Sequence, residues 1–138
     1  PGLLQRTVNM VSQAGVNPSS VFFEVRDQSA VRRSPQWWEI LQAYSQAGFG
    51  LCLDDYGSEA SLFGTLGFHG FRQAKLLVDE KTLLFTSSHQ ARKDLQYCAK
   101  GVAQKFDKKA LAKAGFHLAQ GYAISRPIDE SDVDGLLS

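Results

Sequence analysis

Two adjacent carboxylates, Asp54 and Asp55, follow an apolar run that is long enough to form a buried strand. Buried parallel strands read as near-continuous apolar runs, and α/β folds place their active sites at the carboxyl ends of such strands. Neighbouring carboxylates repel each other unless a cation or a strong donor compensates them. Because oxygen-rich sites suit Mg²⁺, Mn²⁺ or Ca²⁺, the pair indicates a metal site, unless the two acids merely cap a following helix.

Two other charged residues interrupt apolar runs. Lys75 lies in the middle of Phe71–Leu77, which has the pattern of a second strand, and Glu24 interrupts the run at 21–25. A charged side chain in a strand either reaches solvent or is directed into a site, because burial without a partner is costly. The residues alone leave both interpretations open for each of the two.

The composition is that of an ordinary globular protein. The 138 residues suffice for one domain with a single core, and the hydrophobic share of 43% and charged share of 21% are typical. A formal net charge of +1 gives no field that would attract a nucleic-acid polymer or a membrane, and the apolar runs are too short to span a bilayer. The two cysteines suggest no disulfide framework, so we expect a cytoplasmic location.

The elements that must position these side chains alternate along the chain. Helical spacing predicts helices over 3–14 and from Ser34-Pro35 to Gly48, and a short helical piece over 61–66. Strands are predicted at 21–25, at 51–53 and at Phe71–Leu77. This alternation favours parallel strands joined by right-handed crossovers, and hence an α/β fold of the layered or barrel type.

The second half of the chain is read in the same way. Leu95, Cys98, Ala99, Val102 and Phe106 keep helical spacing and predict a helix over about 89–106. Asp107 would cap a short helix that Gly115 ends, and residues 116–122 form a last strand. A weak helix is expected at the C-terminus.

Three short motifs stand at the ends of predicted strands. Residues 23–27 read FEVRD, residues 54–58 read DDYGS, and residues 120–127 read QGYAISRP, with Ser61, Leu66 and Lys75 following the second motif. In order, and in spacing between the first two, they are similar to the "E-x-T-E", "DDFGTGYSSL…K" and "QGYLFSRP" motifs of the EAL domains. Those domains are the cyclic di-GMP phosphodiesterases of bacterial signalling, and the resemblance covers almost the whole chain.

The resemblance implies a modified TIM barrel with its site at the carboxyl ends of the strands. In active members, acids from successive strands hold two divalent cations that activate a water for attack on a phosphodiester. Carried over by position, Glu24 and Asp54 would bind the first metal and Asp55 the second. Lys75 would orient the water and stabilise developing charge, and Gln120 would line the same pocket.

The chain also departs from the family pattern. The family's Glu-Ala-Leu strand and the next strand, with its metal-binding asparagine, would precede Pro1. We therefore expect residues 1–138 to form a single EAL-like domain, an incomplete TIM-barrel-like α/β fold with mostly parallel strands that lacks the family's first two strands. Exposed strand edges would then favour a homodimer, a protein partner or an N-terminal segment that covers them.

A later glutamate of the family, in its "AEGVE" motif, is also missing. Counting back from Gln120 aligns residues 99–103 with that motif and puts Lys100 in place of the acid, whereas the helical spacing would mean that the strand is deleted. Either alternative removes the acid. Glu59-Ala60 replaces the family's Gly-Tyr, and Asp27 stands where a loop-holding glutamate is usual.

These departures predict a degenerate, catalytically silent EAL domain that binds cyclic di-GMP or a protein partner and needs no metal cofactor. Lys75 would then pair with Asp54 or Asp55 and replace the missing cation. The alternative is a fragment of an active phosphodiesterase that uses Mg²⁺ or Mn²⁺. A plain structural α/β domain is the third hypothesis, which the ordered motifs disfavour.

Overall fold

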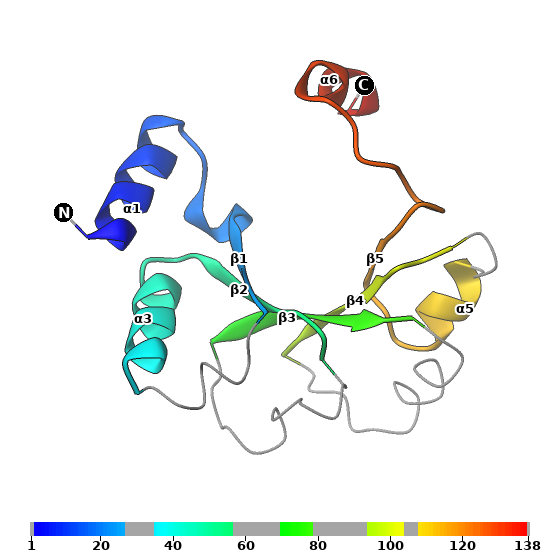
Figure 1. Cartoon of the computed structure of the whole chain (residues 1–138), viewed down its shortest axis with the longest axis horizontal. Helices are drawn as coiled ribbons and strands as arrows, with labels where there is room; N and C mark the ends of the chain where they lie inside the picture. Colours follow the sequence, from blue (N-terminus) through cyan, green and yellow to red (C-terminus); the bar gives the residue numbers. More distant parts are fainter. Residues whose placement is uncertain (1, 27–34, 57–69, 79–93, 104–107, 138) are drawn as a thin grey trace.

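The computed structural model of the chain describes residues 2–26, 35–56, 70–78, 94–103 and 108–137 (Figure 1). The predicted helical piece at 61–66 lies outside these ranges, as do Ser34, Asp107 and the positions of the Asp27 and Glu59-Ala60 departures.

A five-stranded parallel sheet is the centre of the fold. Its strands lie side by side in chain order: β1 (Phe22–Val25), β2 (Gly50–Leu53), β3 (Phe71–Leu77), β4 (Gln96–Lys100) and β5 (Leu118–Gln120). Every neighbouring pair is parallel. The predicted α/β fold with parallel strands is therefore confirmed, and over the described ranges the sheet is open, with β1 and β5 as its edges.

Helices flank the sheet. Helix α1 (Leu3–Gln13) leads through the 3-10 turn η1 (Pro18–Ser20) into β1, and α3 (Pro35–Gln46) precedes β2. Gly48, at φ 92°, takes the left-handed conformation that lets the chain turn from α3 into β2. Helix α5 (Lys108–Lys113) precedes β5, and the C-terminal segment leads away from the sheet through η2 (Glu130–Asp132) to α6 (Val133–Leu137) (Figure 1).

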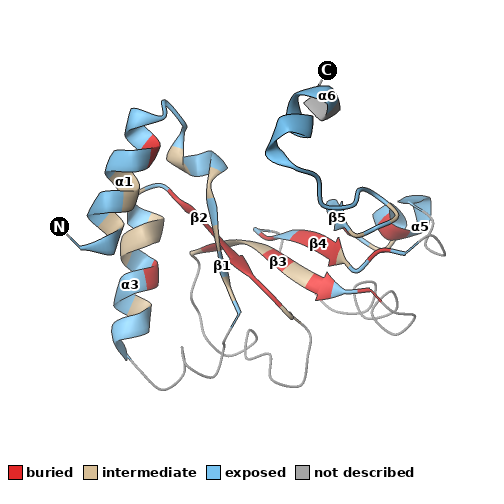
Figure 2. Cartoon of the chain, turned by 45° about the horizontal axis from the view of Figure 1, so that its top comes forward, coloured by how far each residue is buried: buried red, intermediate tan, exposed pale blue. Residues whose placement is uncertain are grey.

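The core lies against one face of the sheet. Alternate strand residues point to the same face, so Leu51, Leu53, Ala74, Leu76, Tyr97 and Ala99 form one buried cluster. Leu41 of α3 and Leu111 of α5 pack into this cluster. Buried residues accordingly concentrate along β2, β3 and β4 (Figure 2). The opposite face, which is the polar face of the sheet, carries the charged and amide side chains of Glu24, Gln73, Lys75, Gln96, Lys100 and Gln120, with Cys52 and Cys98 buried among them.

The helix predicted over 89–106 is wrong where the structure describes it. Residues 96–100 form β4, which pairs with β3 on one side and β5 on the other. Tyr97 and Ala99 face the core, while Cys98 is buried on the other face, so both faces of this short strand are apolar and the pattern imitates helical spacing. The hypothesis that this strand is deleted is also wrong, and Lys100 ends it.

Candidate functional site

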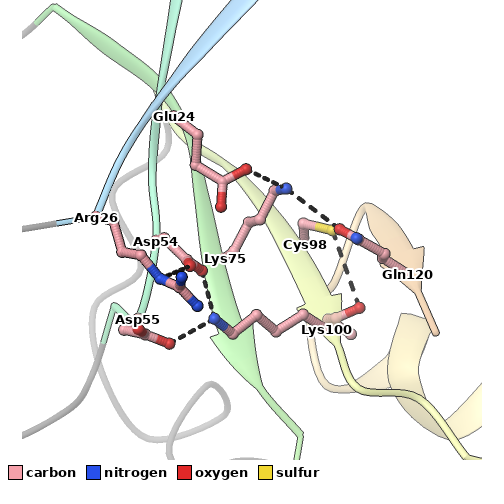
Figure 3. A network of polar contacts seen from close by, with 9 residues as sticks. Glu24, Arg26, Asp54, Asp55, Lys75, Cys98, Lys100 and Gln120 are labelled. Atoms are coloured by element: carbon pink, nitrogen blue, oxygen red, sulfur yellow. Dashed lines mark hydrogen bonds and ion pairs between the residues drawn. The ribbon is translucent and has the colours of Figure 1, made fainter.

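One face of the sheet gathers charged side chains from β1, β3, β4 and the end of β2, together with the amide of Gln120 from β5 (Figure 3). Glu24 lies in β1, Asp54 directly follows β2, and Lys75 lies in β3. Lys100 and Gln120 are the last residues of β4 and β5 and are register partners. Parallel strands bring their carboxyl ends to one edge of a sheet. This is why side chains that are up to 96 positions apart in sequence (120 − 24) meet here.

Lys75 occupies the middle of this face. Its Nζ lies 2.6 Å from Oε2 of Glu24 and 3.2 Å from Oε1 of Gln120, so it joins the two edge strands from the central one. Burial lowers the pKa of Lys75, but the hydrogen bond and the charge of Glu24 outweigh burial and hold that pKa above its ordinary value. Lys75 is therefore a charged donor at neutral pH.

Lys100 is the cation that Asp54 and Asp55 share. Its Nζ lies 2.5 Å from Oδ1 of Asp54 and 2.5 Å from Oδ1 of Asp55. Nε of Arg26 lies 3.7 Å from the other oxygen of Asp54. The expectation that Lys75 neutralises the two aspartates is thus corrected, because the ammonium of Lys75 bonds Glu24 and Gln120 while Lys100 reaches the acid pair from the neighbouring strand.

Asp54 is buried, with only 3% of its surface exposed. Burial raises the pKa of its carboxyl, but the hydrogen bond from Lys100, that from the backbone of Asp55 and the charge of Lys100 outweigh it and place the pKa below the ordinary value. The pKa of Lys100 is correspondingly raised: burial lowers it, and the bonds to both aspartates more than offset that. Both groups are therefore ionised at neutral pH and form a true ion pair.

The backbone explains how two neighbouring acids reach one ammonium. Adjacent residues of an extended strand point to opposite faces, but Asp55 adopts a left-handed conformation with φ 54°. The backbone N–H of Tyr56 then donates to the carbonyl of Lys75 at 2.9 Å, so the chain after β2 bends towards the end of β3. Aspartate tolerates this conformation better than most residues. The turn brings the second carboxylate to the side of the first.

Two thiols, those of Cys52 and Cys98, lie beneath the charged groups. Both cysteines are free and buried, and their register partners are Glu24 and Lys75. Burial is the main cause that raises the pKa of Cys52 to about 11, and burial also raises the pKa of Cys98. Both thiols therefore stay protonated at neutral pH, and the expectation of no disulfide framework agrees with two free cysteines.

A divalent cation does not fit the site as it stands. Glu24, Asp54 and Asp55 are the predicted metal ligands, and each is in an ion pair with a side-chain cation. Three carboxylates face three cations, Arg26, Lys75 and Lys100, so the formal charge of the cluster is zero (3 − 3). Among the residues that the structure describes, no group of three or more His, Cys, Asp or Glu is arranged to hold a metal ion. The metal and catalytic roles stay predictions.

Sequence reasoning missed two features of the site. The motifs assign no role to Arg26, although it lies two positions after Glu24 and therefore on the same face of an extended chain. Lys100 was recognised as a replacement for an acid, but its contact with both aspartates was not foreseen. The alignment of residues 99–103 placed it at the end of a strand, which was the available signal.

Comparisons with known proteins concern the family and the fold. The family model of the EAL domain matches residues 1–127 of the chain. No curated protein matches the chain. Over the described parts of the chain, no helix has the length and apolar character needed to cross a membrane.

Several solved structures share the fold. The phosphodiesterase PaMucR in complex with c-di-GMP superimposes with a TM-score of 0.70 at 21% identity, over 96% of this chain and 58% of that one. BlrP1 of Klebsiella pneumoniae, in a manganese and cyclic di-GMP complex, gives 0.72 at 24% identity, over 92% and 35%. The EAL enzyme Bd1971, bound to cAMP and cyclic di-GMP, gives 0.77 at 18% identity, over 94% and 37%. The chain thus spans between about a third and three fifths of their lengths.

Proposed function

The chain belongs to the EAL domain family, and we propose that it is a regulatory EAL domain of bacterial cyclic di-GMP signalling. In this proposal it binds cyclic di-GMP without hydrolysing it. The ligand is proposed because structural neighbours are complexes with this nucleotide. The absence of hydrolysis is proposed from the charges of this chain's own site.

One observation carries the proposal: every carboxylate that would bind a metal already has a side-chain cation as its partner. Lys75 lies 2.6 Å from Glu24, and Lys100 lies 2.5 Å from both aspartates. Metal-assisted hydrolysis would require these oxygens to hold divalent ions, whose chemistry would be to supply an activated water. Breaking the pairs would leave ammonium groups in the site, where they repel a divalent cation. Family metals, if bound, would have to be held by Glu24, Asp54 and Asp55.

A phosphodiester ligand has donors available on the same face. The guanidinium of Arg26 is 81% exposed, and its ion pair with Asp54 is long, at 3.7 Å. Guanidinium groups bind phosphate oxygens in pairs. Lys75 presents a second cation in the centre of the face. These two residues would hold the nucleotide's phosphates, while the buried thiols beneath offer no nucleophile.

An active metal-dependent phosphodiesterase is the alternative. The gathering of Glu24, Asp54, Asp55, Lys75 and Gln120 on one face favours it, because these are the residues to which the family resemblance assigns metal binding and catalysis. A protein-interaction module is compatible with either function, since the edge strands β1 and β5 leave room for a partner or a second copy.

Calorimetry and product analysis together test the proposal. The chain is titrated with cyclic di-GMP in the presence of EDTA, and separate samples are incubated with nucleotide and MnCl₂ or MgCl₂ and analysed by chromatography. We expect binding, weakened by Arg26→Ala but not by the control Arg6→Ala on the exposed surface of α1, and no linear dinucleotide. Steady conversion to the linear dinucleotide, abolished by Asp54→Asn, would establish the enzyme instead.

A further inference from the structure

The ammonium of Lys100 sits where a shared cation between two carboxylates would sit. It contacts Oδ1 of Asp54 and Oδ1 of Asp55 at the same distance, 2.5 Å. We propose that Lys100 is a tethered cation that excludes divalent metals from Asp54 and Asp55, so that this one residue sets the metal preference of the site. The inference rests on the proposed function, because it explains why a domain that keeps Asp54 and Asp55 would bind no divalent metal and would not hydrolyse its ligand.

The position of Lys100 is fixed by the backbone around it. Lys100 and Gln120 are register partners, and the N–H of Val102 donates to the carbonyl of Gln120 at 3.1 Å. Gly121 lies so close that an added Cβ would meet the backbone nitrogen and oxygen of Val102 at 2.4 Å. The ends of β4 and β5 are therefore packed backbone against backbone. This packing positions the backbone of the lysine, and its side chain crosses β3 to the acids (Figure 3).

The tether gives Lys100 an advantage over a free ion. A group held on the same chain acts at an effective concentration of millimolar or more, and it loses no translational freedom when it binds. The acid pair offers no spare charge, because Asp54 also faces Arg26 and the cluster sums to zero. Asp54 is buried and cannot exchange its partner for bulk water without cost. A metal must therefore displace the ammonium rather than join it.

Exchanging Lys100 for an acid reverses this balance. In Lys100→Glu the cluster has four carboxylates, Glu24, Asp54, Asp55 and the new one, against two cations, Arg26 and Lys75. A formal charge of −2, with oxygen ligands from β1, from the end of β2 and from β4, is suited to Mn²⁺ and Mg²⁺. A neutral side chain of similar length, as in Lys100→Gln, leaves a charge of −1 and should open the site less.

Manganese titration followed by electron paramagnetic resonance tests the inference, with free Mn²⁺ as the measured species. The wild-type chain should bind no Mn²⁺ at micromolar to low millimolar concentration. Lys100→Glu should bind one equivalent or more, with an affinity at least about tenfold higher, which corresponds to ~1.4 kcal/mol. The matched control is Lys108→Glu on the exposed surface of α5, which makes the same change in net charge away from the site and should bind none.

Three results would overturn the inference: wild-type binding of Mn²⁺ that Asp54→Asn removes, a folded Lys100→Glu chain with wild-type affinity, or an equal gain in Lys108→Glu. If Lys100→Glu fails to fold, Lys100→Gln decides in the same titration. If that also unfolds, the thermal melt of the wild-type chain decides: a melt unchanged by MnCl₂ supports exclusion, and stabilisation contradicts it.

The same samples separate this inference from the proposed function. Mn²⁺ binding by the wild-type chain without linear dinucleotide would overturn metal exclusion and leave the regulatory domain standing. Linear dinucleotide without Mn²⁺ binding would overturn the regulatory domain and leave metal exclusion standing.

Discussion

Lys100, the last residue of β4, passes over β3 and pairs with Asp54, the first residue after β2. The pair thus joins two strands that are not neighbours in the sheet. Its acid is buried, whereas the comparable pair of Lys75 involves a Glu24 side chain that is 42% exposed. Lys100 therefore pairs with a buried carboxylate and Lys75 with a partly exposed one, so their contributions to the free energy of unfolding should differ.

Replacing Lys100 should destabilise the chain more than replacing Lys75. Lys100→Met leaves a buried carboxylate without its main partner, which costs about 3 kcal/mol. Lys75→Met leaves Glu24 accessible to water, so its loss should stay near that of a surface pair, below about 1 kcal/mol. The free energy of unfolding, from urea titrations, gives both values. Equal losses would contradict the assignment of Lys100 as the partner of the buried acid.

A second substitution should rescue the first. In Lys100→Met/Asp54→Asn the buried charge is removed together with its cation, so part of the lost stability should return. In Lys75→Met/Asp54→Asn no recovery is expected, because the ammonium of Lys75 bonds Glu24 and Gln120. Urea unfolding of the wild-type chain, the three single variants and the two double variants completes both cycles. Recovery only in Lys75→Met/Asp54→Asn would mean that in solution Asp54 pairs with Lys75 and not with Lys100.

The stability of the chain should fall in acid partly through Asp54. Burial raises the pKa of its carboxyl, but the bonds from Lys100 and from the Asp55 backbone hold it below the ordinary 3.8. A lowered folded-state pKa contributes stability that is complete above the unfolded-state pKa and is lost as pH falls through the folded-state value. Urea midpoints between pH 6 and pH 2 should therefore drop less in Asp54→Asn than in the wild-type chain. Asp134→Asn, an exposed control on α6, should keep the wild-type acid slope, and identical slopes in all three would refute the effect.

The two thiols should be inert until the chain unfolds. Cys52 is 2% exposed and Cys98 is 6% exposed. Burial raises the pKa of Cys52 to about 11, so at pH 8 roughly one thiol in a thousand is ionised. Iodoacetamide labelling followed by mass spectrometry should be at least about tenfold slower in buffer than in urea. Comparable rates in the two solvents would show that the polar face is open to reagents.

Gly121 should tolerate no side chain. Its φ of 154° disfavours other residues, and an added Cβ would meet the backbone of Val102 at 2.4 Å. Gly121→Ala must separate the ends of β4 and β5, so we expect a loss of about 2 kcal/mol or more in unfolding free energy. Gly2→Ala, where an added Cβ meets nothing within 4 Å, is the control and should change little. A stable Gly121→Ala chain would mean that these strand ends are not packed as described.

Local patterns predicted the elements well where each strand had a clear boundary. Strand β3 occupies the predicted residues, because Gly70 precedes a run with apolar residues at both of its ends. Strand β4 was mistaken for a helix, because Cys98 is buried on the face opposite Tyr97 and Ala99 and so conceals the alternation. Whether such a segment forms a strand or a helix is decided by its pairing with two neighbouring strands, which is a tertiary effect.

The gathering of acids and cations on one face was also predictable, but their pairing was not. Which ammonium reaches Asp55 depends on the left-handed turn at that residue and on the reach of a lysine over an intervening strand. Neither leaves a signature in residue types. The motifs therefore indicated the members of the cluster, and the backbone determined the contacts.

Because the strands are unequally buried, we expect them to open to solvent in a definite order. All four residues of β2 are buried, whereas all three of β5 are exposed. Amide protons of β2 should thus exchange with solvent only in global unfolding, and those of β5 in local opening events. Gln120 travels with β5, so its hydrogen bond to Lys75 breaks and reforms many times while the Lys75 to Glu24 contact persists. We therefore expect local opening of the polar face to begin at β5. A ligand held by Gln120 would slow amide hydrogen exchange in that strand first.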